Sequence, residues 1–159
     1  MQVASLSDIK RELSILEKED ILQICLRLGR FKKDNKELLT YLLFEAGDEA
    51  GYIASLQAYI DEAFLDMNTS SLYLVKKSLR KVLRNITRMI RYSGNKQTEA
   101  EVLIYFCKVL LNSSIRITAS VQLVSLYERQ LVKIEKALKK LHEDLQADYQ
   151  YELTKLTLQ

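Results

Sequence analysis

The 159-residue chain contains no proline and no tryptophan, and it has only four glycines, two cysteines and one histidine. Average usage would place about eight prolines in a chain of this length. Proline and glycine supply the fixed and the positive φ angles of tight turns, which sheets need at many places. Their scarcity favours helices joined by short polar turns and disfavours a β-sandwich or an α/β sheet.

Long hydrophobic runs are also missing. The longest uninterrupted apolar run, from Val102 to Cys107, ends at Lys108, far short of the ~20 residues that span a bilayer. The first residues show no basic segment followed by an apolar one, so no secretion signal is predicted. Cys25 and Cys107 lie in apolar stretches, which predicts buried, reduced thiols and a cytoplasmic location.

Helix caps and breaks predict seven helices. The pattern of capping residues and glycines favours a stop at Gly29, a cap at Asp48 and a stop before Ser93 and Gly94. Thr98 with Glu101 has the spacing of a capping box. The first expected helix, 6–16, has Ser5 or Ser7 as its cap, and the third, 38–46, is opened by Asp34 and Glu37. The fifth follows the polar cluster 68–71. The other expected helices are 21–28, 49–66, 98–111 and 120–149.

The sixth of these helices is apolar on nearly all sides, with Val102, Ile104, Phe106 and Leu110 among its residues. A helix without a polar face is typical of a bundle centre. With 48% hydrophobic and 28% charged residues, the chain is expected to be all-α. We expect a single-domain antiparallel bundle, residues 1–159, of six to seven helices around the sixth. The tail 150–159 is expected to fray.

Basic residues gather in the expected fifth helix, where no acidic residue interrupts them from Lys76 to Arg91. At 3.6 residues per turn all but Lys76 fall within an arc of about 100°, opposite an apolar side. Arginine and lysine in such a row can bind phosphates or carboxylates. The candidate anion- or partner-binding residues are Lys77, Arg80, Lys81, Arg84, Arg88 and Arg91.

A structural interpretation of this basic row competes with the functional one. Residues 38–75 contain six acidic residues and no lysine or arginine. If the fourth and fifth helices form an antiparallel hairpin, some of these acids could lie against the basic row. Otherwise the row is a solvated face, which is the usual role of a charge run.

The last expected helix carries apolar residues at alternating spacings of three and four, from Val124 through Leu138 to Leu145. This pattern is typical of a coiled-coil contact. It predicts either packing within the protein's own bundle, which we favour, or self-association or docking of a partner helix.

Enzymatic chemistry has little support in the sequence. His142 is the only histidine and is expected to be half-exposed on a helix; neither cysteine belongs to a C-x-x-C pair. Gly47 and Gly51 are followed by no phosphate-binding lysine. We therefore predict no catalytic residue, no metal ligand and no cofactor.

Residues 26–53, LRLGRFKKDNKELLTYLLFEAGDEAGYI, resemble a segment of a family of small all-helical bacterial proteins without an assigned function. The resemblance rests on residues 31–33 and 38–45. It implies an all-helical fold and no particular activity. The function expected from the sequence is a non-catalytic helical protein-interaction module, and the alternative is a nucleic-acid-binding protein that uses the basic row.

Overall fold

The computed structural model describes residues 2–157, and these residues form eight α-helices and no strand. The expected all-α class is therefore confirmed. Contacts between residues divide the chain into two compact units, Met1–Phe44 and Glu45–Gln159, which we call the N-terminal and C-terminal units. The single-domain organisation expected from the sequence stays a prediction.

The N-terminal unit contains three short helices, α1 (Leu6–Ser14), α2 (Lys18–Phe31) and α3 (Lys33–Thr40). Ser5 caps α1 by accepting a hydrogen bond from the backbone N–H of Asp8 at 3.2 Å. The predicted stop at Gly29 is wrong, because α2 continues to Phe31. A Cβ at Gly29 would lie only 3.1 Å from the side chain of Leu39. This glycine therefore permits close packing of α2 on α3 and does not end the helix.

The third helix also begins earlier than expected. Lys32 occupies the cap position of α3, so Asp34 lies within the first turn and does not form the predicted capping box. After Thr40 the chain continues as a π-helical turn, Tyr41–Glu45. A wider turn of this kind shifts the register of the side chains that follow it.

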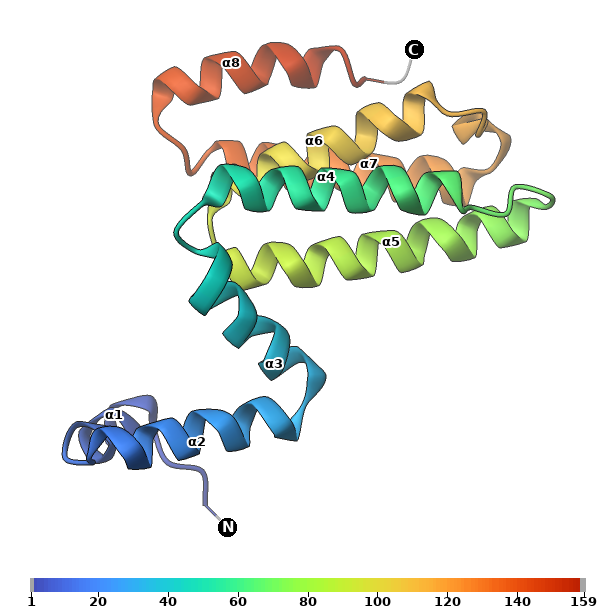
Figure 1. Cartoon of the computed structure of the whole chain (residues 1–159). Coiled ribbons are helices and arrows are strands. Elements are labelled where there is room, and N and C mark those ends of the chain that lie inside the picture. Colours follow the sequence, from blue (N-terminus) through green and yellow to red (C-terminus); the bar gives the residue numbers. More distant parts are fainter. Residues whose placement is uncertain (1, 158–159) are drawn as a thin grey trace. The chain divides into compact units, whose positions relative to one another are not determined.

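The C-terminal unit contains α4 (Glu49–Leu65), α5 (Leu72–Ser93), α6 (Lys96–Asn112), α7 (Val121–Leu138) and α8 (Glu143–Thr154). Consecutive helices run in opposite directions (Figure 1), as the short turns between them predict. Asp48 and Ser71 cap α4 and α5, and Gly94 ends α5 with φ of +67°. These three local signals are confirmed.

Helix α6 is the centre of this unit and contacts α4, α5 and α7. Val102, Phe106 and Cys107 are fully buried in it. Phe106 meets Phe64 of α4 edge to face, with ring centroids 5.8 Å apart. Within the C-terminal unit, the expected packing of neighbouring helices around this apolar helix is confirmed.

The start of α6 differs from the prediction. Asn95 caps the helix by accepting a hydrogen bond from Gln97 N–H at 2.9 Å, so the capping box of Thr98 and Glu101 is wrong. Thr98 is instead fully buried, and its hydroxyl donates a hydrogen bond to the carboxylate of Glu49. The hydroxyl of Ser93 donates to the same carboxylate. One acidic side chain in the first turn of α4 thus joins the end of α5 to the start of α6.

The last expected helix, 120–149, is two helices. It ends at Leu138, and α8 begins after His142, whose Nδ1 accepts a weak hydrogen bond from Asp144 N–H at 3.4 Å. His142 is exposed and lies at a cap, so its expected half-exposed position on a helix is wrong. A short 3₁₀ turn, Ile117–Ala119, fills the segment before α7.

The end of α8 is packed. Leu153 and Leu156 are buried, and the hydroxyl of the buried Tyr127 donates a hydrogen bond to the Leu156 carbonyl at 2.6 Å. Through residue 157 the chain therefore differs from the fraying expected for residues 150–159, of which residues 158–159 lie outside the described part.

Candidate binding surfaces

The basic row lies along α5, whose opposite side forms part of the core. Val75, Leu79 and Ile86 are buried, whereas Lys77, Arg80, Lys81, Arg84 and Arg91 are exposed. Lys76 and Arg88 are half-buried. We call the seven residues Lys76, Lys77, Arg80, Lys81, Arg84, Arg88 and Arg91 the basic stripe.

Most of the basic stripe faces solvent without an acidic counterpart. Among the residues that the structure describes, Lys77, Arg80, Lys81, Arg84 and Arg91 make no ion pair within 4.0 Å. Lys76 donates a hydrogen bond to Gln122 of α7 at 2.8 Å. The positive charge of the stripe is therefore largely available to an external anion.

The acids of α4 approach one edge of this stripe. Glu62, Asp66 and Lys81 line a shallow cleft of about 270 Å³ between α4 and α5. Asp61 points elsewhere, because its carboxylate accepts hydrogen bonds from the Tyr105 hydroxyl of α6 at 2.8 and 2.9 Å. Pairing with α4 was one interpretation of the stripe, and the structure brings these acids near Lys81 without an ion pair.

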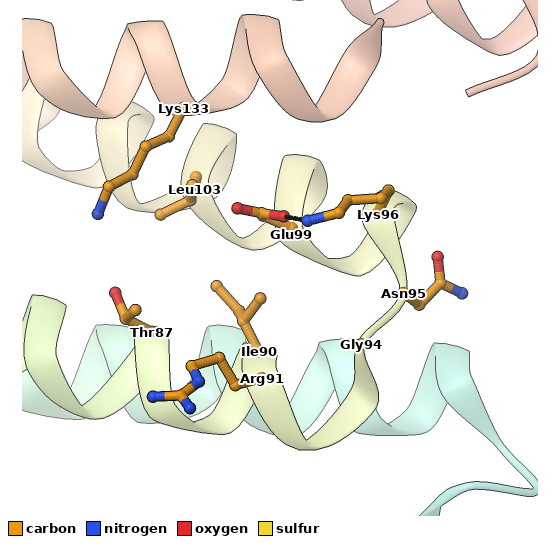
Figure 2. A pocket seen from close by; sticks show the side chains of 9 residues that line it. All are labelled: Thr87, Ile90, Arg91, Gly94, Asn95, Lys96, Glu99, Leu103 and Lys133. Carbon is orange, nitrogen blue, oxygen red and sulfur yellow. Dashed lines mark hydrogen bonds and ion pairs between the residues drawn. The ribbon is translucent and has the colours of Figure 1, made fainter. Parts of the chain in front are cut away.

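A larger cleft of about 390 Å³ opens where α5 turns into α6, and three helices supply its basic side chains (Figure 2). Arg91 comes from α5, Lys96 from α6 and Lys133 from α7. Glu99 is the acidic residue among those that line it, and its carboxylate pairs with Lys96. In Figure 2 the side chains of Arg91 and Lys133 extend toward the same side of the cleft.

Lys133 belongs to a second basic row that sequence reasoning missed. Arg129, Lys133 and Lys136 are exposed on α7, and their spacings of four and three place them within an arc of about 60°. Gln122, which accepts the hydrogen bond from Lys76, falls in the same arc. The spacing of these three residues is visible in the sequence. That Lys133 lines the same cleft as Arg91 of α5 follows only from the fold.

The N-terminal unit presents a different surface. Ile24, Leu28 and Phe31 recur at spacings of four and three on α2 and are 38%, 52% and 75% exposed. On the neighbouring side of α2, Ile21, Cys25 and Gly29 are half-buried. We call Ile24, Leu28 and Phe31 the outer row of α2. Cys25 is thus less buried than the sequence predicted.

The apolar seam of the last expected helix lies mainly inside the C-terminal unit. Tyr127, Ile134 and Leu138 are buried, while Val124, Leu131, Leu141 and Leu145 are half-buried. The seam also crosses the break between α7 and α8. Its packing in the protein's own bundle agrees with the interpretation that we favoured.

A polar cleft of about 310 Å³ between α6 and α8 holds a cluster of titratable groups, including Glu101, Lys108, Tyr149 and Glu152. Glu152 pairs with Lys108 at 2.5 Å and with Lys155 at 3.1 Å, and Lys108 holds its pKa below the ordinary value. Burial and a hydrogen bond to Glu101 raise the pKa of Tyr149 to about 12. These groups satisfy one another, so the cluster fastens α8 to α6.

Cys107 does not meet the requirements of a nucleophile paired with His142. Cys107 is fully buried, and burial raises the pKa of its thiol to about 12, which keeps it protonated at neutral pH. His142 is exposed at the start of α8. Within residues 2–157 no group of three or more histidine, cysteine or acidic side chains is arranged to hold a metal ion.

In the same residues, none of the helices combines the length and the apolar character that crossing a bilayer requires. Comparisons with protein-family models, with curated proteins and with solved structures found no match. The resemblance of residues 26–53 to a family of small helical bacterial proteins therefore stays a prediction.

Proposed function

We propose that the protein is a non-catalytic interaction module whose α2 docks into an apolar groove of a protein partner. The outer row of α2 carries this proposal. Ile24, Leu28 and Phe31 stand at positions i, i+4 and i+7, the spacing of the anchor residues by which helices bind grooves.

Burial of this partly exposed apolar surface would favour binding. Complete burial of one large apolar side chain contributes about 1.5–3 kcal/mol, and the outer row offers three. Leu42, Leu43 and Phe44 extend the exposed apolar surface of the same unit. Apolar surface of this extent on one unit is typical of interaction sites.

The occupant of this surface is either a different protein or a second copy of the chain. The free thiols of Cys25 and Cys107 support a reducing compartment, the cytoplasm, as the place where it binds.

Replacement of Leu28 by glutamate tests this proposal. We expect Leu28→Glu to abolish association and to leave the C-terminal unit folded, because the charge removes one anchor at an exposed position. Light scattering measures self-association, and cross-linking in cells measures association with another protein. Leu65→Glu is the matched control, because Leu65 is exposed on the C-terminal unit.

Association that survives Leu28→Glu, or that Leu65→Glu removes equally, would contradict the assignment to α2. A monomer without a partner, in which Leu28→Glu also lowers the melting temperature, would show that the outer row is covered within the monomer. That result would overturn the proposal.

We propose nucleic-acid binding by the basic stripe as a second candidate function. Five exposed cations without an ion pair favour it. An anionic membrane is less suitable as the partner, because a helix that enters a bilayer surface needs its apolar face free. In α5 that face is occupied, since Leu79 and Ile86 are fully buried.

Charge reversal in the middle of the stripe tests this second function. We expect the double variant Arg80→Glu/Arg84→Glu to abolish binding to single-stranded RNA without loss of fold, because both residues are exposed. For the wild-type protein the logarithm of the affinity should fall with the logarithm of salt concentration by about 0.7 per phosphate contact.

Lys18→Glu/Lys36→Glu is the matched control, because it makes the same change in net charge on exposed residues of the N-terminal unit. Equal losses in both double variants would indicate attraction by net charge alone and would argue against a site on α5.

A further inference from the structure

The cleft in Figure 2 contains more positive charge than its one carboxylate can balance. Glu99 pairs with Lys96, which leaves Arg91 and Lys133 without an ion pair among the described residues. These two side chains come from different helices, α5 and α7. Two uncompensated cations that face one concave space are suited to an anion of two or more oxygens.

The remaining lining of the cleft is compatible with such an anion. The hydroxyl of Thr87 is a further donor from α5, one turn before Arg91. Ile90 and Leu103 form the apolar part of the wall, and apolar walls lower the local dielectric constant and strengthen charge–charge attraction.

The cleft also joins two rows of cations. Helices α5 and α7 run in the same direction (Figure 1). The hydrogen bond from Lys76 to Gln122 connects them near their first turns, and Arg91 and Lys133 line one cleft farther along. The basic stripe and the row of Arg129, Lys133 and Lys136 therefore lie on two helices that this hydrogen bond and the cleft connect.

The length of the basic stripe favours a polymeric anion over a single small one. Lys76 and Arg91 are fifteen residues apart, which corresponds to about 22 Å along a helix. A row of cations of that length matches a chain of several phosphates, as in a nucleic-acid strand.

We infer that the cleft lined by Arg91 and Lys133 seats one phosphate of a nucleic-acid strand that follows the two rows of cations on α5 and α7. This inference rests on the second proposed function, because it names the second wall of the same binding surface. Arg91 and Lys133 bind phosphate oxygens, and Thr87 donates a hydrogen bond to the same group.

The decisive variant is Lys133→Glu, because Lys133 lies outside the stripe that the sequence identifies. We expect it to weaken the binding of a fluorescent single-stranded RNA by about tenfold, the equivalent of ~1.4 kcal/mol, in an anisotropy titration. Arg91→Glu should have at least the same effect. Far-UV circular dichroism checks that both variants keep their helices.

Two controls separate the cleft from its surroundings. Lys139→Glu makes the same charge change at an exposed position just after α7, on another side of the helix. Lys18→Glu makes it at an exposed position on the N-terminal unit, outside both rows of cations. We expect both controls to weaken binding by less than about threefold, because salt screens the interaction of exposed charges beyond about 10 Å.

A second titration with inorganic pyrophosphate, followed by amide chemical shifts, identifies the phosphate seat directly. The largest shift changes should fall at Thr87, Arg91, Lys96 and Lys133, and Lys133→Glu should remove them. Shift changes spread evenly over the basic stripe would overturn the inference.

The outcomes separate the inference from the function on which it rests. If wild-type protein binds neither RNA nor pyrophosphate, both are overturned. If Arg80→Glu/Arg84→Glu abolishes RNA binding while Lys133→Glu and Lys139→Glu behave alike, only the cleft is overturned. Pyrophosphate binding that Lys133→Glu removes, without RNA binding, would retain the phosphate seat and overturn nucleic acid as its source.

Discussion

The two units of the molecule differ in how far their apolar side chains are buried. Fourteen of the twenty-one large hydrophobic residues that are exposed lie between Val3 and Phe44. All buried hydrophobic residues among those described, except Tyr41, lie from Tyr52 onward. The N-terminal unit thus leaves apolar surface in contact with solvent, whereas the C-terminal unit encloses it.

The difference arises from the kinds of helix that each unit contains. The C-terminal unit has one helix, α6, that is apolar on nearly all sides and that amphipathic helices can surround. The helices of the N-terminal unit have 9, 14 and 8 residues, and helices of such lengths are marginally stable unless tertiary contacts support them. The comparison teaches that the enclosed apolar core belongs to the C-terminal unit, whereas the helices of the N-terminal unit keep most of their large apolar side chains exposed.

The largest expected effect is a loss of folding stability caused by a substitution in the core of the C-terminal unit. Leu138 is 3% exposed and Leu28 is 52% exposed. Leu138→Glu buries an unpaired charge, so we expect it to lower the free energy of unfolding by about 3–5 kcal/mol. Leu28→Glu should change it by less than about 1 kcal/mol. Urea denaturation followed by circular dichroism compares the stabilities of the two variants. Equal losses of stability would show that the outer row is as buried as Leu138 of α7.

A pH effect of intermediate size should arise in the C-terminal unit. Burial raises the pKa of the Cys107 thiol from 9.0 to about 12. Above about pH 9 the unfolded chain loses a proton that the folded chain keeps, so stability falls as pH rises toward 12. The slope from this one thiol is at most ~1.4 kcal/mol per pH unit.

Denaturation curves at neutral and at alkaline pH measure this slope. Cys107→Ala should show a smaller loss than the wild-type protein over the same range. The remaining loss comes from tyrosines such as Tyr127, whose pKa burial also raises. An unchanged slope in Cys107→Ala would assign the whole effect to other groups.

The smallest expected effects on stability come from replacing one glycine in each unit by alanine. Gly94 has φ of +67°, so Gly94→Ala should cost about 1 kcal/mol of stability. Gly29 lies inside α2, where alanine favours the helix, but its Cβ would press on Leu39 at 3.1 Å. We expect these effects to offset each other within about 0.5 kcal/mol. Thermal melts monitored by circular dichroism test both, and a larger loss for Gly29→Ala would show that the packing of α2 on α3 is rigid.

The features predicted correctly are those that depend on neighbouring residues in the sequence. The cap at Asp48, the cap within the polar cluster 68–71 and the end of α5 next to Gly94 are local, and so is the apolar character of α6. The errors have tertiary causes. Thr98 resembled a cap, but its hydroxyl donates to Glu49, which is forty-nine residues earlier.

The break between α7 and α8 was missed because Leu138, Leu141 and Leu145 continue the apolar spacing through it, and no proline or glycine marks it. The candidate surface was predicted in part. Helical periodicity revealed the basic stripe, but the neighbouring position of Lys133 depends on how α7 packs on α6. The exposure of the outer row of α2 likewise could not be read from its apolar residues alone.

The position of α6 along the chain has a consequence for synthesis. Helices α4 and α5 are synthesised before α6 and α7, so the helices that carry Leu56, Ile60 and Leu79 lack the surface of α6 on which they pack at that stage. At about 5–20 residues per second, the ~70 residues from the end of α4 to the end of α7 take roughly 4–15 s. During that interval α4 and α5 have mainly each other to pack against. Closure of the core is therefore delayed until most of the chain has been synthesised.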